Sequence, residues 1–217
     1  MSKFTHSWTQ FSVVARFEGK SSGAITILGA HEDSINLSSP SSGRAPGADD
    51  DGSGTVNLIE IFRALVAASF APSTPVEFHW YSGEEAGLLG SQAIAQSYKR
   101  AGKSVKAFLE LDMTAYFAPG SKEVIALEAD YQDSGVTSFL KALIDTYSTL
   151  DYAMDTPVSL SWPLPRTRRN ADGRGSADTR ARTTRAGTSR GTQPACSMRR
   201  SLATTTRTSI ARATSRL

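Results

Sequence analysis

The sequence predicts an α/β domain over residues 1–157, followed by an Arg-rich tail over residues 158–217. Short apolar runs typical of strands alternate with longer runs of helical periodicity throughout the first segment. Acidic residues and a histidine follow several of these strands, at the positions where α/β folds build their sites. The periodicity ends at Pro157, which sets the predicted boundary.

The first half of the domain is predicted to contain three strands and one helix. The strands are expected at residues 11–17, 24–29 and 76–81. A polar loop rich in Ser, Pro and Gly spans residues 34–47. Residues 55–68 have helical periodicity, and the apolar positions near one helical face are Val56, Ile59, Leu65 and Val66.

The second half of the domain continues the alternation of helices and strands. Helices are expected at residues 87–102 and 135–149, and strands at residues 105–113 and 123–128. The first of these helices ends with Lys99 and Arg100 followed by Gly102, a good termination signal because basic side chains favour the negative end of the helix dipole.

The tail differs from the domain in charge and composition. Residues 1–157 hold 19 acidic and 11 basic residues, whereas residues 158–217 hold 13 Arg, no Lys and two acidic residues. Because the tail has hardly any apolar pattern, it is predicted to be disordered. Arg-rich tails can bind nucleic-acid backbones, although the exclusion of Lys is unusual for such a tail.

Cysteine content and hydropathy argue against a disulfide-stabilised protein and against a membrane-spanning protein. The chain contains one cysteine, Cys196, so no intrachain disulfide can form within this sequence. No apolar run approaches the roughly 18 residues of a membrane span, and no membrane association is expected. The opening residues, SKFTHSWTQ, also lack the apolar segment of a signal peptide.

Four polar clusters lie where predicted strands end or a helix begins. They are His31-Glu32-Asp33, Asp49-Asp50-Asp51, Glu84-Glu85 and Asp112. Each alone has a structural explanation: a solvated turn, a hydrogen-bonded histidine, or acids that favour a helix N-terminus. Their succession at element ends favours a common site instead. Carboxylate and imidazole ligands together suit a divalent transition metal.

The motifs around these clusters resemble those of the zinc-dependent aminopeptidases of family M28, in particular the secreted leucine aminopeptidases of filamentous fungi. The matching stretches are GAHEDS, APGADDDGSG, WYSGEEAGLLGSQ and LELDMT, in the family's order and spacing. The resemblance extends from about Phe4 to about Thr156. It implies a three-layer α/β/α sandwich with a mixed sheet, of which this chain would form a truncated version.

The resemblance also implies a set of metal ligands. His31 and Asp112 would ligate one zinc ion, Glu85 would ligate a second, and Asp50 would bridge the two. Asp33 would orient the His31 imidazole, since such partners fix the ring of a ligating histidine.

Glu84 is implied as the catalytic general base and then acid. In the family, two zinc ions polarise the scissile carbonyl and lower the pKa of a water molecule, while this carboxylate passes its proton to the leaving amine. Peptide substrates and a monomeric, secreted enzyme are expected on the same grounds. Because the family is secreted with a propeptide, the start of this chain is expected to be truncated.

One ligand of the family pattern is missing from the chain. The second zinc ion requires a further histidine downstream of Asp112, whereas the chain contains only His6, His31 and His79. His79 lies within a predicted strand and is interpreted as a structural histidine. The chain is therefore predicted to be an impaired leucine-type aminopeptidase. Two alternatives remain: a glutaminyl cyclase-like enzyme of the same fold, and a non-catalytic product whose basic tail binds nucleic acid.

The tail suggests that the missing histidine is encoded in another reading frame. Codons that encode SADTRARTTRAG (residues 176–187) can be regrouped, starting from the third base of Ser176, to encode Cys-Gly-Tyr-Ala-Cys-Ser-Asp-His-Ala-Ser-Trp. That sequence resembles the family loop that carries the missing ligand. Our hypothesis is that residues 158–175 translate a retained intron and that residues 176–217 are a coding exon translated out of frame.

Sequencing the cDNA across residues 150–190 tests this hypothesis. We expect a transcript that lacks the bases encoding residues 158–175 together with the first two bases of the Ser176 codon, and that therefore reads on in the Cys-Gly-Tyr frame. A transcript population wholly colinear with these 217 codons would contradict it.

Overall fold

A five-stranded mixed sheet forms the centre of the fold. The computed structural model describes residues 1–128, 132–155 and 206–207. The strand order is β1-β2-β4-β3-β5, and the strands are β1 (Ser2–Phe4), β2 (Ser12–Phe17), β3 (Ile25–His31), β4 (Val76–Tyr81) and β5 (Val105–Glu110). The predicted strands are confirmed, with shifts of a few residues at their ends, while β1 was not predicted.

The pairing of the strands brings three chain segments to one edge of the sheet. β1, β2 and β4 pair antiparallel, whereas β3 runs parallel to both β4 and β5. The carboxyl ends of β3, β4 and β5 therefore lie together, with His31 opposite Tyr81 in the register of β3 and β4. This edge carries the polar clusters, as the sequence predicts for an α/β fold.

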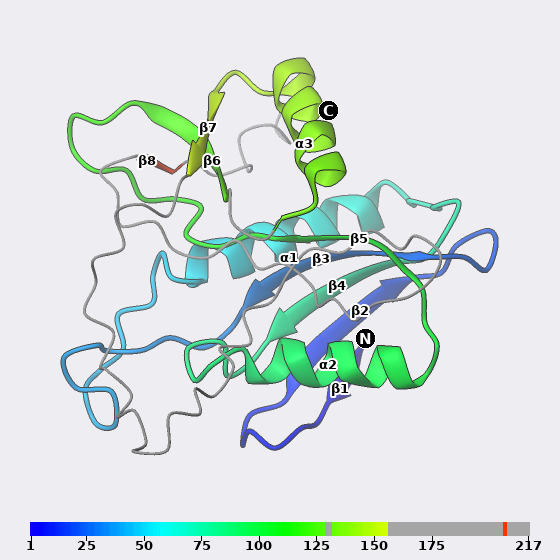
Figure 1. Cartoon of the computed structure of the whole chain (residues 1–217), viewed down its shortest axis with the longest axis horizontal. Helices are drawn as coiled ribbons and strands as arrows, with labels where there is room; N and C mark the ends of the chain where they lie inside the picture. Colours follow the sequence, from blue (N-terminus) through cyan, green and yellow to red (C-terminus); the bar gives the residue numbers. More distant parts are fainter. Residues whose placement is uncertain (129–131, 156–205, 208–217) are drawn as a thin grey trace, which may run out of the picture.

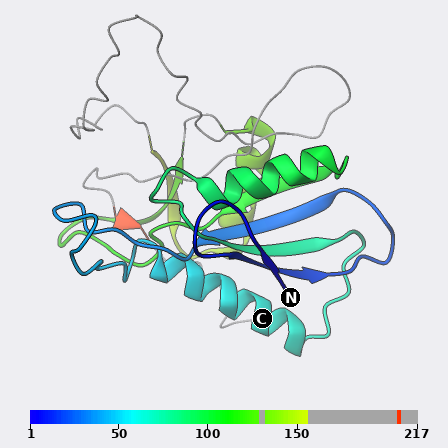
Figure 2. The same cartoon turned by 90° about the horizontal axis from the view of Figure 1, so that it is seen from below.

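Two helices cover opposite faces of the sheet and complete the three layers (Figures 1 and 2). α1 (Gly52–Ala67) packs on one face through a core of Ala15, Ala30, Leu58, Phe78, Trp80 and Leu111. α2 (Leu89–Arg100) covers the other face through Ile25, Ile27, Tyr81, Ile94, Tyr98 and Phe108. The alternating side chains of β4 supply both cores, since successive residues of a strand point to opposite faces. The predicted sandwich with a mixed sheet is thus confirmed.

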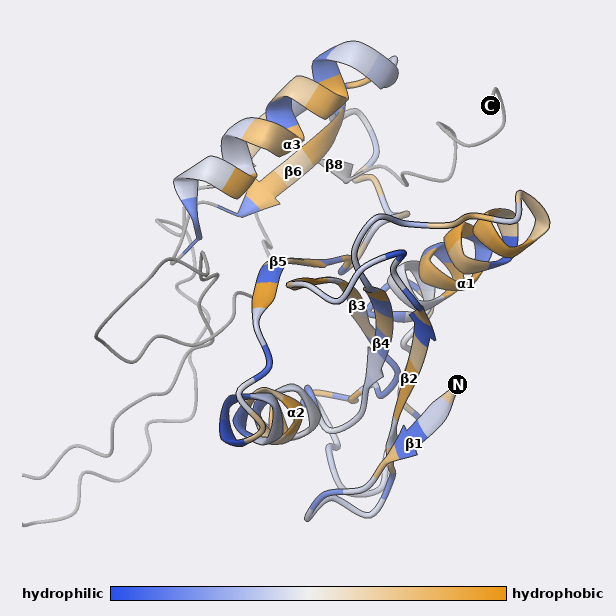
Figure 3. Ribbon diagram, turned by 90° about the vertical axis from the view of Figure 1, so that its right-hand side faces the viewer, coloured by the Kyte–Doolittle hydropathy of each residue, from blue (hydrophilic) through white to orange (hydrophobic). Residues whose placement is uncertain are grey.

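The buried face of α1 differs from the predicted one. Val56, Ile59 and Val66 are about half exposed, while Leu58 is fully buried and Phe62 and Leu65 pack against the core. The side of α1 visible in Figure 3 is largely hydrophobic, and the apolar residues of the helix fall on more than one helical stripe. Helical periodicity alone therefore does not select the buried stripe.

A smaller sheet lies beside the β5 edge in Figure 1. β6 (Glu123–Glu128) pairs parallel with β7 (Asp151–Asp155) and with the two-residue β8 (Thr206–Arg207). α3 (Ser134–Tyr147) begins at the N-cap Asp133, whose side chain accepts from the N–H groups of Gly135 and Val136. β6 and α3 were predicted, whereas β7 and β8 were not. Apart from residues 206–207, the tail predicted to be disordered lies outside the described residues.

A buried polar network crosses the α2 side of β4. Glu77 and His79 are 2% and 0% exposed, and the His79 Nε2–H donates to Glu77 at 2.9 Å. His79 Nδ1 then accepts from the Tyr81 hydroxyl at 2.9 Å. Arg16 and the Tyr98 hydroxyl also donate to Glu77, at 2.7 and 2.6 Å. His79 is therefore a structural histidine, as the sequence predicts.

These donors make the ionised form of Glu77 the stable one. Burial opposes ionisation, but the hydrogen bonds from His79, Tyr98 and Arg16 outweigh it and lower the pKa of Glu77 from 4.5 to about 2. The carboxylate therefore stabilises the fold above pH 4.5, and this stabilisation is lost as the pH falls towards 2.

Glu77→Gln should lower the free energy of unfolding at neutral pH by about 1–3 kcal/mol, because the amide cannot accept all three hydrogen bonds. The difference from the parent chain should shrink between pH 4.5 and 2, as measured by urea unfolding. Glu60→Gln, which alters an exposed pair with Arg63, serves as the control and should leave the acid dependence unchanged. If both substitutions changed the free energy of unfolding equally, the stabilising role of the buried Glu77 carboxylate would be contradicted.

Among the described residues, no helix combines the length and apolar character needed to cross a bilayer.

Candidate metal centre

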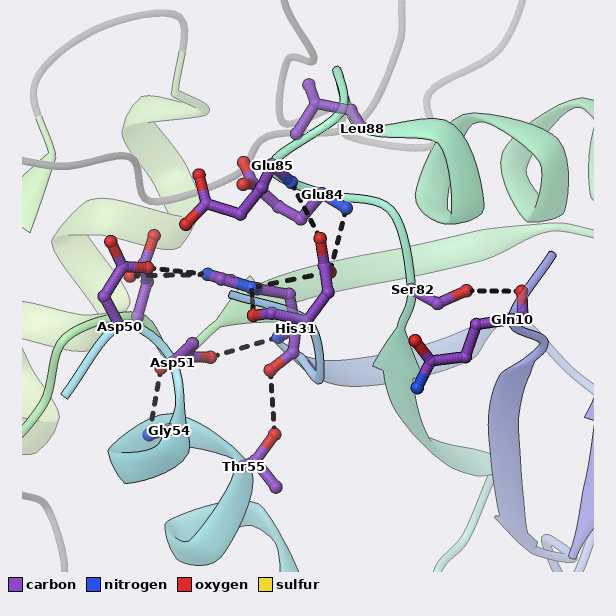
Figure 4. Close-up of polar contacts among 12 residues, drawn as sticks. Gln10, His31, Asp50, Asp51, Gly54, Thr55, Ser82, Glu84, Glu85 and Leu88 are labelled. Carbon is purple, nitrogen blue, oxygen red and sulfur yellow. Dashed lines mark hydrogen bonds and ion pairs between the residues drawn. The ribbon is translucent and has the colours of Figure 1, made fainter. Parts of the chain in front are cut away.

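His31 lies at the centre of the polar edge, as the last residue of β3 (Figure 4). Its side chain is 1% exposed. The imidazole Nδ1 lies 3.0 Å from the Asp33 carbonyl oxygen, and since a carbonyl can only accept, Nδ1 carries a proton. Nε2 faces the carboxylates of Asp50, at 3.0 Å, and of Asp112, at 4.0 Å. The ring is thus oriented with Nε2 towards the acids.

His31, Asp50 and Asp112 form a group that could hold a metal ion. One ligand atom from each residue lies within 4.8 Å of the other two. The residues come from the ends of β3 and β5 and from the segment before α1, which the parallel pairing brings together. One imidazole nitrogen and two carboxylates are a donor set that zinc commonly takes in proteins. The structure therefore assembles three of the residues that the sequence singled out.

The electrostatics of this group favour a cation. Burial opposes protonation of His31, but hydrogen bonding with Asp33 and Asp50 and the charges of Asp112 and Glu84 raise its pKa to about 12. Burial and the charge of Asp112 raise the pKa of Asp51 to about 8. Both shifts reflect buried acids that repel one another and attract positive charge, a situation that a divalent ion would relieve.

Asp51 holds the ligand-bearing segments together. Its carboxylate, which is 2% exposed, accepts from the backbone N–H groups of His31 at 3.0 Å, Gly54 at 3.0 Å and Met113 at 3.3 Å. These donors belong to the end of β3, the start of α1 and the segment after β5. The same oxygens leave no room for a side chain at position 54, because a Cβ there would lie 2.4 Å from Asp51 Oδ1.

Asp49 fixes the segment that follows Asp112. Its Oδ1 accepts from the Ser53 hydroxyl at 3.0 Å and from the backbone N–H groups of Ala115 and Tyr116 at 2.9 and 3.1 Å. The three successive acids thus have separate contacts: Asp49 and Asp51 bind backbone N–H groups, while Asp50 faces the imidazole.

Asp33 connects His31 with the turn that carries Glu84 and Glu85. Its two carboxylate oxygens accept from the backbone N–H groups of Glu84 and Glu85, at 3.0 and 3.1 Å. The nearer carboxylate oxygen is 3.7 Å from His31 Nδ1, so Asp33 contacts the imidazole mainly through its carbonyl. In Figure 4 the Glu84 and Glu85 side chains extend from this turn towards the side of the site where Asp50 lies.

The sequence identified the side chains that gather here but missed the contacts of Asp49 and Asp51. A signal for Asp51 was present, because Asp directly before a helix is a preferred N-cap residue. Asp51 is the N-cap of α1, with its side chain accepting from the Gly54 N–H. Nothing in the local pattern indicates the bonds to His31 and Met113, which depend on the tertiary fold.

Comparison with known sequences gives a family match and close relatives. The sequence model of peptidase family M28 matches residues 12–158. Leucine aminopeptidase 1 of Aspergillus oryzae is 50% identical over 159 residues, which cover 69% of this chain and 41% of that protein. The chain thus spans about two fifths of the length of this relative.

Comparison with solved structures shows the same fold in several enzymes. LapA of Legionella pneumophila superposes with a TM-score of 0.63 and 31% identity, over 70% of this chain and 42% of that one. A glutaminyl cyclase from an Acidobacteriales bacterium superposes with a TM-score of 0.54 and 20% identity, over 71% of this chain and 57% of that one. The second similarity concerns the fold alone.

Alanine substitutions at the neighbours Asp50 and Asp51 should have different effects on the metal-free chain. Asp51→Ala removes the acceptor of three buried N–H groups and should lower the free energy of unfolding by about 2–4 kcal/mol. Asp50→Ala should cost less than about 1 kcal/mol, because it removes one partly exposed pair. Urea unfolding in the presence of a chelator measures both. Equal destabilisation by the two substitutions would contradict the separate contacts described above.

Proposed function

The chain belongs to peptidase family M28, and on that premise we propose that its site is that of a zinc-dependent aminopeptidase. The substrates would be extracellular peptides with a free N-terminus, from which an apolar residue such as leucine is released. The observation that carries the proposal is the group of the buried His31 and Asp112 and the partly buried Asp50, whose ligand atoms lie within 4.8 Å of one another.

The residues present fit one zinc ion well. We assign His31 Nε2, Asp50 and Asp112 as its protein ligands, because these groups converge and because Nδ1 is already occupied by the Asp33 carbonyl. When bound, zinc would polarise the scissile carbonyl and lower the pKa of a water molecule. One imidazole and two carboxylates also match the number of protein ligands that catalytic zinc sites commonly use.

Glu84 is assigned as the general base and acid. Its side chain is 7% exposed, and its backbone is fixed by Asp33, which also contacts His31. Glu84 would take a proton from the attacking water and deliver it to the nitrogen of the leaving peptide, which is the work of a positioned carboxylate. Asp33 thereby sets the distance between the base and the metal ligand.

A second zinc ion would lack a ligand in this chain. Glu85, together with a bridging Asp50, would supply its carboxylates, but neither remaining histidine is available. His79 is fully buried between Glu77 and Tyr81, and His6 contacts Ser12 and Ser82. We therefore propose that the chain binds one zinc ion and has strongly reduced activity. The missing histidine would be encoded in the shifted frame of residues 176–187.

The enzymatic assignment is tested by comparing two proteins. The 217-residue chain should bind one equivalent of zinc and hydrolyse leucyl-p-nitroanilide slowly or not at all. The product of the spliced transcript, which lacks the bases for residues 158–175 and the first two bases of the Ser176 codon, should hydrolyse it at least about 100-fold faster. Glu84→Gln in that spliced product should lower the rate by about 100- to 10,000-fold.

Two outcomes would contradict the proposal. Full turnover by the 217-residue chain would show that no ligand is missing. Absence of turnover in the spliced product, despite bound zinc, would show that the site is not an aminopeptidase site.

A further inference from the structure

The turn that carries Glu84 and Glu85 is also contacted at its start, by residues 6–12, which we call the N-terminal brace. His6 Nε2 lies 3.1 Å from the hydroxyl oxygens of both Ser12 and Ser82. Ser82 and Gly83 form the start of the turn, directly after β4. The M28 sequence model matches from residue 12 onward, so the matched residues include Ser12 and Ser82 but not His6.

The hydrogen-bond directions in the brace follow from its fixed groups. His6 Nδ1 accepts from the Trp8 backbone N–H at 3.3 Å, so the neutral ring carries its proton on Nε2. Nε2–H therefore donates to the serine hydroxyls. The Ser82 hydroxyl in turn donates to the Gln10 carbonyl at 2.9 Å, a contact drawn in Figure 4. The Ser82 N–H donates to Ser12 Oγ at 3.1 Å.

Packing around these bonds leaves the turn little freedom. Ser12 and Ser82 are both fully buried. Gly83 has φ +68, and a Cβ at this position would lie 3.1 Å from the ring of Trp8. A Cβ at Gly90, near the start of α2, would lie 2.5 Å from both Ser12 Oγ and the Ser82 carbonyl oxygen. The brace therefore holds the beginning of the turn against β2 and α2.

We propose that His6 is a positioning residue for Glu84 and Glu85. The N–H groups of these two residues are held by Asp33, while the preceding Ser82 is held by His6 and Ser12. The turn is thus fixed at two successive points, and the Nε2–H donor of His6 forms the link at the first of them. An effect of His6 on catalysis rests on the proposed function of Glu84, whereas its effect on the position of the turn does not.

Two substitutions separate the two nitrogen atoms of His6. In Asn the side-chain oxygen takes the place of Nδ1 and can still accept from the Trp8 N–H, but no donor reaches the serines. In Gln the amide nitrogen takes the place of Nε2 and can still donate to the serines. If the donor positions the turn, His6→Gln should preserve the native turn and His6→Asn should loosen it.

Amide hydrogen exchange of the full 217-residue chain, followed by NMR, measures this directly. We expect His6→Asn to speed exchange of the Glu84 and Glu85 N–H groups about tenfold, the factor that corresponds to ~1.4 kcal/mol. His6→Gln should change it less than about twofold. The amides of β3 and β5 should be unaffected in both, and Asp33→Ala is the positive control for releasing the same two N–H groups.

Equal exchange in the two His6 variants, or a uniform increase across the sheet, would overturn the proposal. The measurement needs no turnover and no metal. If the expected exchange pattern appears but the spliced product hydrolyses no substrate, the aminopeptidase proposal fails and the positioning role of His6 stands. If the spliced product hydrolyses the substrate but the exchange pattern does not appear, only the positioning role of His6 is overturned.

Discussion

Three backbone N–H groups from distant parts of the sequence donate to one buried carboxylate, that of Asp51. One donor ends β3, one begins α1 and one follows β5, so this carboxylate fixes the mutual position of the segments that carry His31, Asp50 and Asp112. An unpartnered buried N–H is costly, and three of them on one acceptor leave few alternative arrangements. The geometry of the candidate metal centre therefore depends on this acceptor as well as on the pairing of β3 with β5 and on the 3.0 Å contact between His31 and Asp50.

The arrangement concentrates negative charge where the protein cannot solvate it. Burial and the neighbouring charges of Asp112 and Glu84 raise the pKa of Glu110 well above its usual value, and the same surroundings raise the pKa values of Asp51 and His31. Without a positive charge nearby, such a cluster of buried carboxylates destabilises the fold. In the metal-free chain the His31 proton supplies part of that charge, and the proposed zinc ion would replace it at the same nitrogen. If zinc binds as proposed, its binding would therefore stabilise the fold.

Local sequence patterns predicted most helices and strands, whereas the features that depend on packing between distant segments were missed. The strand at 76–81 was predicted with its observed bounds, because its alternation and flanking turns are local signals. The predicted buried face of α1 was wrong for Val56, Ile59 and Val66 and right for Leu65. Val56 and Ile59 repeat with the same helical spacing as Leu58 and Phe62. Only the anchoring of the helix at Asp51 and its packing on β4 select between these stripes. β7 escaped prediction because five residues with two acids carry too weak a pattern.

The candidate site divides in the same way. His31, Asp33, Asp50, Glu84, Glu85 and Asp112 could be singled out because residue type and position at strand ends indicate chemistry. Their catalytic roles remain proposals, supported by geometry and by the family. The contacts of Asp49, Asp51 and His6 link segments tens of residues apart, and no spacing rule in the sequence encodes them. They are side chains whose partner is a backbone group or a buried hydroxyl, which residue identity alone does not reveal.

X-ray absorption at the zinc edge, recorded on the 217-residue chain with one equivalent of zinc, tests the central claim most directly. We expect a single imidazole ligand, His31, with oxygen atoms completing the coordination. A sulfur ligand at about 2.3 Å, which only Cys196 or a methionine could provide, or a second imidazole would place the ion elsewhere in the chain and contradict the account.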